Sequence, residues 1–455
     1  MTKWVVLAIA ALAFFGFFLI KFSSDVNIVP TNTTRSLHHV HPRANYITPN
    51  SIFVYNAYLD KRGGSNKLRV LAINRCHKES EFIIYARLDG KQHGLTPQPI
   101  EGTCPWTWAK GCTLATYFHD IDVSENFTDT QVIVQGGYRY SVQDITVVTD
   151  EDESFLTVCV PPIYWYTDWT KLILFVEWWK SQFASKIIFY HQSSTEDVKT
   201  VLDYYVSEGV AEVIQWSLLP SSSTFNPNDE VYRLGHSLAM NDCVLRAKSQ
   251  LVALVDIDEL IVPKTSSLPD LLSKKFNNTT LGSLQFSHRV LLYDPPLAPS
   301  PFRFASADFA GVGNAIYKNI TGPPKTIIRR KAIDRMSTHT VKSFLDGQWT
   351  QNQTGTALLL HNRYNYVGVQ TDVPEVLVNI TEDAISFRAK LIAVRDKIFP
   401  NGACFDPETQ RALGSCLRDW RKNQGNCKAP ATACLDVMKY RENWVETTNA
   451  SYYVV

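Results

Sequence analysis

The stretch Leu251-Val252-Ala253-Leu254-Val255-Asp256-Ile257-Asp258-Glu259 decides the fold that we expect for this chain. Its five consecutive apolar residues predict a strand that is buried on both faces of a sheet. Because side chains alternate along a strand, Asp256 and Asp258 should point to the same side. Two carboxylates at the carboxyl end of a buried strand predict an oxygen site for Mg²⁺ or Mn²⁺. A bare Asp-x-Asp is also common by chance, and taken alone it is better explained as a solvated acidic strand end.

The sequence before these aspartates alternates between strand-like and helix-like patterns. We expect strands at 155–160, 186–190, 210–216 and 251–255, separated by helices at 168–183, 194–209 and 230–248. This alternation predicts an α/β fold in which a largely parallel sheet is covered by helices on both faces. Ligands of such sheets bind at the carboxyl ends of the strands, where Asp256 and Asp258 lie. The architecture therefore favours a nucleotide-sugar site over a chance match, by analogy with other proteins of this layout.

Composition and motifs argue against several other classes of protein. The net charge is +1 and no basic stripe with interleaved aromatic residues is present, so nucleic-acid binding has no support. No Gly-x-Gly-x-x-Gly opens the first helix and no Walker loop occurs, which argues against a dinucleotide-binding fold or an NTPase. The chain also lacks the Gly-x-Ser-x-Gly elbow of an α/β hydrolase.

Five parts are predicted along the chain. Residues 1–22 contain an uncharged apolar run at 4–20, which would be about 26 Å long as a helix and predicts a signal anchor. A cleaved signal peptide is the alternative, but its apolar region is usually about 7–15 residues long. Residues 23–50 predict a stem, 51–150 a small β-rich domain, 151–400 the α/β domain, and 401–455 a cysteine-rich carboxyl-terminal extension. We therefore expect a single-pass type II protein of the Golgi or another secretory-pathway membrane, with its bulk in the lumen.

Nine cysteines and eight Asn-x-Ser/Thr sites agree with an oxidising, lumenal compartment. The chain has no Cys-x-x-Cys pair, so disulfides are favoured over zinc. Four cysteines lie early, at 76, 104, 112 and 159, and four lie late, at 404, 416, 427 and 434, and each group allows three pairings. Cys243 is left as the candidate buried thiol. We expect the late cysteines to form a remote structural staple, with a cap over the acceptor site as the alternative.

A set of motifs in fixed order resembles one enzyme family. The set comprises Val160-Pro161-Pro162-Ile163-Tyr164, a tryptophan-rich helix, Ile187-Ile188-Phe189-Tyr190, Asn241-Asp242-Cys243 and the acidic cluster at 256–259. Together these motifs resemble glycosyltransferase family 92, a group of membrane-anchored enzymes, over about residues 155–400. The resemblance implies a GT-A-like, Rossmann-type sheet. It also implies inverting, metal-assisted transfer of a sugar, galactose in this family, from a UDP-sugar to the glycan of a glycoprotein or glycolipid. Mn²⁺ or another divalent cation would be the cofactor.

The resemblance also implies roles for individual residues. By analogy with GT-A enzymes, Asp258 binds the metal directly and Asp256 contacts the ribose or the metal. These enzymes often add a histidine from the end of the domain. We prefer His361, which follows the apolar run 357–360, and keep His339 as the second candidate. For either histidine the alternative is a structural role with a hydrogen bond to the backbone.

The remaining chemistry concerns the diphosphate and the acceptor hydroxyl. Lys325, Arg329 and Arg330 could offset the charge of the diphosphate, and a solvated basic turn is the alternative. Inversion requires a base that deprotonates the acceptor. Asp308 is our candidate for this base, and Asp294 and Asp334 are the other available carboxylates. A competing hypothesis for the whole chain is a catalytically silent, membrane-tethered carbohydrate-binding protein on the same fold.

Overall fold

The computed structural model describes most of the chain after residue 46. The described residues are 47–448 and 452–454, apart from 77–83, 89–90, 105, 107–108, 110, 125–130, 135–138, 142–144, 294–302, 305–307, 354, 363–372, 405–406, 423–426 and 428. The predicted signal anchor and nearly all of the predicted stem lie outside these residues. No helix among the described residues is long and apolar enough to span a membrane. The described residues belong to one compact unit, and the domain boundaries at 150 and 400 stay predictions.

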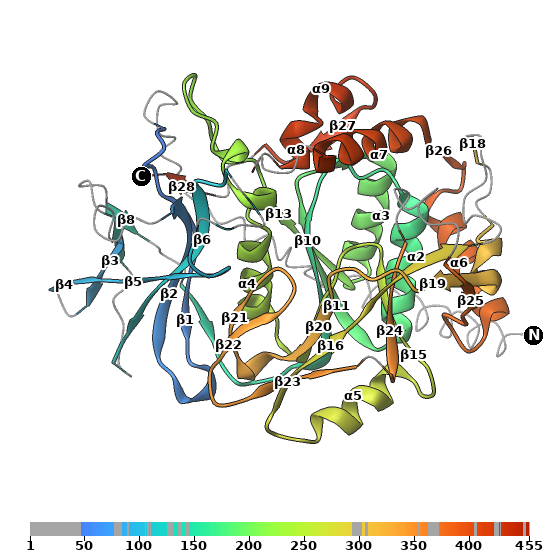
Figure 1. The fold of residues 1–455 in the computed structure, drawn as a ribbon, viewed down its shortest axis with the longest axis horizontal. Coiled ribbons are helices and arrows are strands. Elements are labelled where there is room, and N and C mark those ends of the chain that lie inside the picture. The colour runs from blue at the N-terminus through green and yellow to red at the C-terminus, as the bar shows by residue number, and fades with distance from the viewer. Residues whose placement is uncertain are drawn as a thin grey trace, which may run out of the picture. The chain divides into compact units, whose positions relative to one another are not determined.

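A seven-stranded sheet forms the centre of the fold (Figure 1). From edge to edge its strands are β13 (Ala211–Gln215), β11 (Ala184–His191), β10 (Ser154–Ile163), β14 (Ser249–Leu254), β20 (Lys325–Arg329), β16 (Leu281–Phe286) and β23 (Trp349–Asn352). β10 runs parallel to β11 and β14, and β11 runs parallel to β13. β20 is antiparallel to both of its neighbours. The predicted α/β fold and the parallel pairing of its first four strands are therefore confirmed.

Helices cover both faces of this sheet because the residues of its buried strands point alternately to each side. The covering helices are α2 (Trp169–Ser181), α3 (Glu196–Ser207) and α4 (His236–Arg246). Leu251 and Ala253 of β14 pack in the core that contains residues of α2 and α3, whereas Val252 and Leu254 pack in the core that contains α4. Figure 1 shows α4 on the opposite side of the sheet from α2 and α3. The run 251–255 is buried on both faces, as its sequence predicts.

A second sheet brings a distant histidine beside the acidic cluster. Its strands are β15 (Glu259–Pro263), β24 (Ala357–His361), β17 (His288–Tyr293), β19 (Ala315–Lys318) and β25 (Glu375–Leu377). β15 begins at the acidic cluster and pairs antiparallel with β24, so that Glu259 lies opposite His361. β17 runs parallel to β24 on its other side. Two further helices are α5 (Leu268–Phe276) and α6 (Ala384–Ile398).

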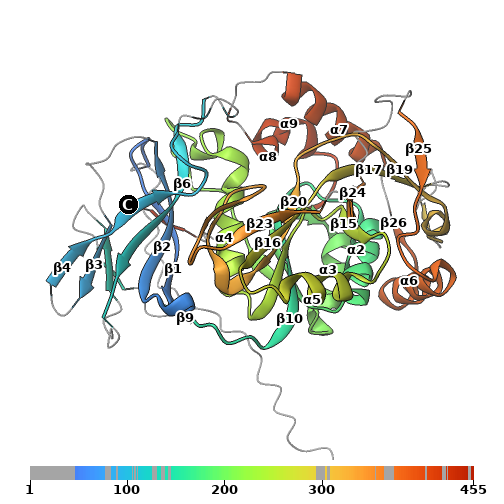
Figure 2. The same ribbon diagram turned by 60° about the horizontal axis from the view of Figure 1, so that its bottom comes forward.

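The amino-terminal part of the described chain forms a separate, mainly antiparallel sheet. Its strands are β28 (Tyr453–Val454), β1 (Phe53–Asp60), β2 (Lys67–Arg75), β6 (Leu114–Asp122) and β5 (Thr96–Pro99), with β9 (Thr146–Val148) beside β1. Figures 1 and 2 both show α4 between this sheet and the central sheet. The hydroxyl groups of Tyr58 in β1 and Tyr190 in β11 both donate to the buried carboxylate of Asp242 in α4. The contact between the two sheets is therefore built on a satisfied polar centre as well as apolar packing.

Shorter elements complete the described fold. The remaining strands are β3 (Ile84–Leu88), β4 (Lys91–Gly94), β7 (Gln131–Val134), β8 (Arg139–Ser141), β12 (Ser193–Thr195), β18 (Arg303–Phe304), β21 (Ile333–Met336), β22 (Val341–Phe344), β26 (Ala403–Cys404) and β27 (Trp444–Glu446). The last helices are α7 (Pro407–Lys422), α8 (Pro430–Ala433) and α9 (Leu435–Met438). The 3₁₀ helices are η2 (Arg62–Gly64), η3 (Pro227–Asp229), η4 (Tyr232–Leu234), η5 (Ala310–Asn314) and η6 (Arg330–Ala332).

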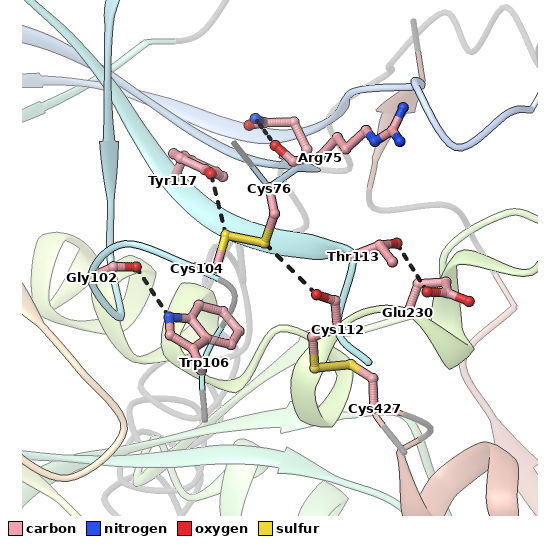
Figure 3. Close-up of a disulfide and its surroundings, with 11 residues drawn as sticks. Arg75, Cys76, Gly102, Cys104, Trp106, Cys112, Thr113, Tyr117, Glu230 and Cys427 are labelled. Carbon is pink, nitrogen blue, oxygen red and sulfur yellow. Dashed lines mark hydrogen bonds between the residues drawn. A yellow bond between two sulfur atoms is a disulfide. The ribbon is translucent and has the colours of Figure 1, made fainter. Parts of the chain in front are cut away.

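Four disulfides join described residues, and they correct two expectations about the cysteines. Cys76–Cys104 and Cys416–Cys434 close within the early and late groups, but Cys112–Cys427 joins one group to the other (Figure 3). The prediction that Cys243 is a thiol is wrong, because Cys243 is bonded to Cys159. Cys159 in β10 points to the sheet face that α4 covers, and α4 contains Cys243. Grouping by position in the sequence failed for Cys159 and Cys243 because packing of a helix on a strand brings distant residues together.

Candidate functional site

A cavity of about 220 Å³ lies at the carboxyl ends of β10 and β14. Part of its lining comes from the acidic turn (residues 256–259) that follows β14, and part from the aromatic turn (residues 164–166) that follows β10. Leu413, Leu417 and Trp420 of α7 supply an apolar wall. Figure 1 shows α7 beyond the end of β10. The disulfide Cys416–Cys434 is therefore not remote from the cavity, since Cys416 lies in the helix that forms this wall.

Three side chains at the acidic turn have the composition of a metal site. Asp256, Asp258 and His361 each offer one ligand atom, and these atoms lie within 4.8 Å of one another. Nε2 of His361 is 3.0 Å from Oδ1 of Asp258. The pairing of β15 with β24 explains this approach, because it places the end of β24 directly beside the acidic turn. Two carboxylates and one imidazole fit a hard or borderline divalent cation such as Mn²⁺.

Glu259 and Lys325 contact the acidic turn from its buried side. Oε2 of Glu259 accepts a hydrogen bond of 2.7 Å from the backbone N–H of Asp256. Burial raises the pKa of Glu259, against the opposing effect of the Lys325 ammonium. Nζ of Lys325 lies 2.7 Å from Oδ1 of Asp256 and 3.6 Å from Oε2 of Glu259. The structure thus places Lys325, which we expected near a diphosphate, directly against the candidate metal site.

Two further cationic side chains, which no motif in the sequence indicated, reach the cavity. Lys171 lies in the first turn of α2, where its Nζ donates to the backbone oxygen of Asn362 at 3.3 Å, and burial lowers its pKa. Arg233 lines the cavity from a left-handed backbone with a φ of 44°. Such a backbone is uncommon for a residue with a side chain and occurs preferentially at functional sites. The N-cap Asp168 could have pointed to Lys171, whereas no pattern in the sequence indicated Arg233.

Two histidines beside Lys325 are held in the neutral form. His236 lines the cavity at the start of α4, and burial together with the charge of Lys325 lowers its pKa well below the ordinary value. His339, our second candidate for a metal ligand, is close enough to Lys325 and Asp256 to feel both charges. Burial, followed by the charge of Lys325, lowers the pKa of His339 to about 3. The cluster of metal-ligating atoms contains His361 and does not include His339.

Arg329 and Asp308 lie away from this cluster. The guanidinium of Arg329 donates to the backbone oxygens of Leu281 and Asn278, at the other end of β20 from Lys325. The carboxylate of Asp308 forms an ion pair of 3.1 Å with Arg388, and its side chain is 52% exposed. Neither residue is among the described residues that line the cavity. Of the predicted site residues, the structure therefore gathers Asp256, Asp258, His361 and Lys325 and has His339 beside them. It leaves Arg329 and Asp308 outside, together with Arg330, whose guanidinium donates to the backbone oxygens of Ser249, Thr149 and Glu151.

One buried histidine next to the candidate metal ligands, His288, was not predicted from the sequence. Nε2 of His288, at the start of β17, lies 2.7 Å from Nδ1 of His361. The two histidines are 73 positions apart, so no local spacing could link them. Only the parallel pairing of β17 with β24 brings them together.

Comparisons with known proteins identify a family. A model of glycosyltransferase family 92 matches residues 154–394. A glycosyltransferase family 92 protein of Caenorhabditis elegans is 28% identical over 141 residues, an alignment that covers 30% of this chain and only 28% of that protein. Among solved structures, the glucosyl-3-phosphoglycerate synthase of Mycobacterium tuberculosis was determined with Mn²⁺, uridine diphosphate and glucosyl-3-phosphoglycerate. It is 11% identical, with coverage of 54% of this chain and 80% of that one and a TM-score of 0.22, at which the likeness carries no argument.

Proposed function

The chain belongs to glycosyltransferase family 92, whose model matches more than half of it, and from this premise we propose that it is an inverting, metal-dependent UDP-sugar glycosyltransferase. The sugar is galactose, and the acceptor is the glycan of a glycoprotein or glycolipid. Galactose and the acceptor class rest on the motifs that resemble the family. Dependence on a divalent cation rests on the site itself.

The cluster of Asp256, Asp258 and His361 is the observation that carries this proposal. It lies at the carboxyl end of a buried parallel strand and adjoins a cavity, which is where sheets of this type bind ligands. Asp258 and His361 would hold the cation, and Asp256 would complete the set or contact the ribose. A divalent cation supplies Lewis-acid stabilisation of the negative charge that develops on a diphosphate leaving group.

Other side chains in the cavity have the charges and shapes that a nucleotide-sugar needs. Lys171 and Arg233 line the cavity and offer positive charge to the diphosphate. Lys325 is held against Asp256 and adds a third cation at the same end. The apolar wall of α7 and the aromatic turn offer flat, apolar surfaces for the nucleoside and exclude water from the reacting bond.

Asp308 stays our proposed base for the acceptor hydroxyl. Its carboxylate is paired with Arg388 and lies outside the described lining of the cavity. It can therefore act as the base only if the bound donor places its anomeric carbon near η5, at whose start Asp308 accepts from the N–H of Ala310, because the base must contact the hydroxyl that attacks this carbon. Replacement of Asp308 by Asn should then lower turnover and leave the affinity for Mn²⁺ unchanged.

We also propose a lumenal location in the Golgi or another secretory compartment, with single-pass type II anchoring. Four disulfides join described residues, and disulfides persist in oxidising compartments. The asparagines of the Asn-x-Ser/Thr sites that fall among the described residues are all exposed: Asn277, Asn278, Asn319, Asn352 and Asn379. Glycosidase treatment of the protein from a secretory host, read as a mass shift, tests this location.

The function is tested with the full chain, produced in a eukaryotic secretory host and purified in mild detergent. UDP release is measured for a panel of UDP-sugars with Mn²⁺, with and without glycan acceptors. Asp258→Ala should lower kcat/KM by ~100-fold or more, because several kcal/mol of transition-state stabilisation depend on the cation. Asp203→Ala is the matched control, since Asp203 is an exposed carboxylate paired with Lys199 in α3.

The outcomes separate the two hypotheses for this chain. Turnover that survives Asp258→Ala contradicts the assignment of the metal site. Binding of glycans without turnover of any UDP-sugar contradicts the proposed enzyme and favours the silent carbohydrate-binding protein.

A further inference from the structure

We propose that His288 is a positioning residue that fixes the imidazole of His361 in the tautomer whose Nε2 lone pair faces Asp258. His288 would thereby prepare His361 to bind a divalent cation without contacting the cation itself. This inference rests on the proposed metal-dependent function and adds to it a residue outside the candidate ligand set.

The geometry is a chain of three groups that ends at the acidic turn. His288 and His361 are both buried, with 2% and 3% of their surfaces exposed. Nδ1 of His288 lies 3.2 Å from the backbone oxygen of Ile320, and its Nε2 lies 2.7 Å from Nδ1 of His361. Nε2 of His361 then lies 3.0 Å from Oδ1 of Asp258. The imidazole rings stand nearly perpendicular, at 83°, with centroids 4.9 Å apart.

The direction of each hydrogen bond in this chain follows from its first member. A backbone carbonyl can only accept, so Nδ1 of His288 must donate to Ile320. An uncharged imidazole has a single N–H, so Nε2 of His288 is then an acceptor. Nδ1 of His361 must therefore donate to His288, and this leaves the lone pair of an uncharged His361 on Nε2.

The surroundings of His361 favour the same tautomer. Oε1 of Glu259 lies 3.5 Å from Nδ1 of His361 and attracts the proton on that nitrogen. On the other side of the ring, a lone pair on Nε2 faces a carboxylate oxygen of Asp258, and two acceptors at this distance attract a cation between them. Metal-binding histidines in proteins are generally oriented by a hydrogen bond to their second nitrogen, and His288 supplies this bond.

Gly322 gives independent evidence that the surrounding chain packs closely against the His288 ring and fixes its position. A Cβ atom added at Gly322 would lie 2.9 Å from both Cγ and Nδ1 of His288, which is too close for any ordinary contact. Gly322 is not among the glycines with a positive φ, so its backbone does not require glycine. The lack of a side chain allows the segment with Ile320 to close against the His288 ring, and this brings the carbonyl to Nδ1.

The test measures the dissociation constant of Mn²⁺ alone, from the loss of the free Mn²⁺ signal in electron paramagnetic resonance, with no donor or acceptor present. His288→Phe keeps a ring of similar size but cannot accept a hydrogen bond, and it should weaken Mn²⁺ binding by about 10–100-fold. His288→Gln retains an acceptor and should bind Mn²⁺ within about threefold of the wild type. Gly322→Ala should weaken binding in the same direction as His288→Phe. His93→Phe, at an exposed histidine in β4, should change nothing.

A spectroscopic readout separates positioning from a merely structural role. Electron spin-echo modulation by ¹⁴N reports an imidazole nitrogen on bound Mn²⁺, and this signal should be present in the wild type and in His288→Gln but reduced in His288→Phe. Equal Mn²⁺ affinity and an unchanged ¹⁴N signal in His288→Phe and Gly322→Ala would overturn the inference. Asp258→Ala distinguishes the two levels: if it binds Mn²⁺ like the wild type, the proposed metal site itself is wrong, whereas loss in Asp258→Ala without loss in His288→Phe refutes only the role of His288.

Discussion

The paired strands β14 and β20 have two ends, and each end uses basic residues for a different purpose. At the site end, the ammonium of Lys325 lies 2.7 Å from Asp256 beside the cavity. At the far end, which is ~13 Å away at about 3.3 Å per residue, the guanidinium groups of Arg329 and Arg330 donate to backbone carbonyls. The antiparallel register separates them, because Arg329 lies opposite Leu251 at the start of the buried run. The basic residues at 325–330 are thus divided along β20: Lys325 lies at the candidate metal site, and Arg329 and Arg330 bind backbone groups that hold the fold together.

This division makes opposite predictions for the two ends. Substitutions at the far end should lower the free energy of unfolding and leave turnover per folded molecule unchanged. Substitutions at the site end should change metal binding and turnover with little effect on stability.

Arg330→Met should have the largest effect. The buried guanidinium donates to the backbone oxygens of Ser249, Thr149 and Glu151 and to the carboxylate of Asp152. Its loss leaves these acceptors without their donor, and we expect the free energy of unfolding to fall by about 4 kcal/mol. Urea unfolding followed by tryptophan fluorescence measures this change. Lys331→Met, at the exposed neighbour, is the control and should stay within about 0.5 kcal/mol of the wild type. A selective loss of turnover in folded Arg330→Met would contradict the comparison.

Asp60→Asn tests the buried ion pairs that support the far end of β20. The carboxylate of Asp60 is bound by Arg62 and Arg69, and Nη1 of Arg62 also donates to the backbone oxygen of Arg330. Burial alone would raise the pKa of Asp60, but the two guanidinium groups lower it from 3.8 to about 2. A depressed carboxyl pKa stabilises the folded state above pH 4, by about 2 kcal/mol here, and this stabilisation is lost as the pH falls from about 4 to 2.

The measurement for Asp60 is the difference in unfolding free energy between the wild type and Asp60→Asn as a function of pH. The difference should be constant from pH 7 to about pH 5 and should shrink steadily below pH 4. A difference that persists at pH 2 would show that Asp60 acts through shape and not through its charge.

Arg329→Met should cost less than Arg330→Met, about 1.5 kcal/mol, because its described acceptors are backbone oxygens near α5 and include no carboxylate. Thermal unfolding measures this change. Turnover is the decisive second readout, since we first expected Arg329 to face the diphosphate. A fall in kcat/KM beyond the loss of folded protein would restore that role and break the division between the two ends.

The strands, the helices and the acidic turn could be predicted because hydrophobic periodicity is a local property of the sequence. The run 251–255 is an example: its buried faces follow from residue type alone. His361 could be ranked above His339 because it ends an apolar run, and strand ends meet at one edge of a sheet. Arg329 was placed at the site because a sequence does not show where a strand lies relative to its antiparallel neighbour. His288 lay beyond prediction, since its contact with His361 exists only through the pairing of β17 with β24.

Lys325→Met should cause the smallest of these changes, a change in the free energy of Mn²⁺ binding. The sign of this change is informative, because we expect the substitution to strengthen binding. The ammonium of Lys325 competes with any divalent cation for the carboxylates of Asp256 and Glu259. Its removal should strengthen the binding of Mn²⁺ in the absence of nucleotide by about fivefold, or ~1 kcal/mol. Turnover should fall at the same time, because a cation that offsets the diphosphate charge is lost.

Stronger Mn²⁺ binding together with lower turnover is the result that distinguishes the site end of the strand pair from the far end. Titration with Mn²⁺ measures the affinity, and UDP release at saturating Mn²⁺ measures the turnover. Lys264→Met is the matched control, because Lys264 is an exposed lysine just after β15 and should leave both quantities unchanged. If Lys325→Met instead weakens Mn²⁺ binding and lowers stability as Arg330→Met does, Lys325 serves the framework too. The basic cluster would then have one purpose along the whole strand.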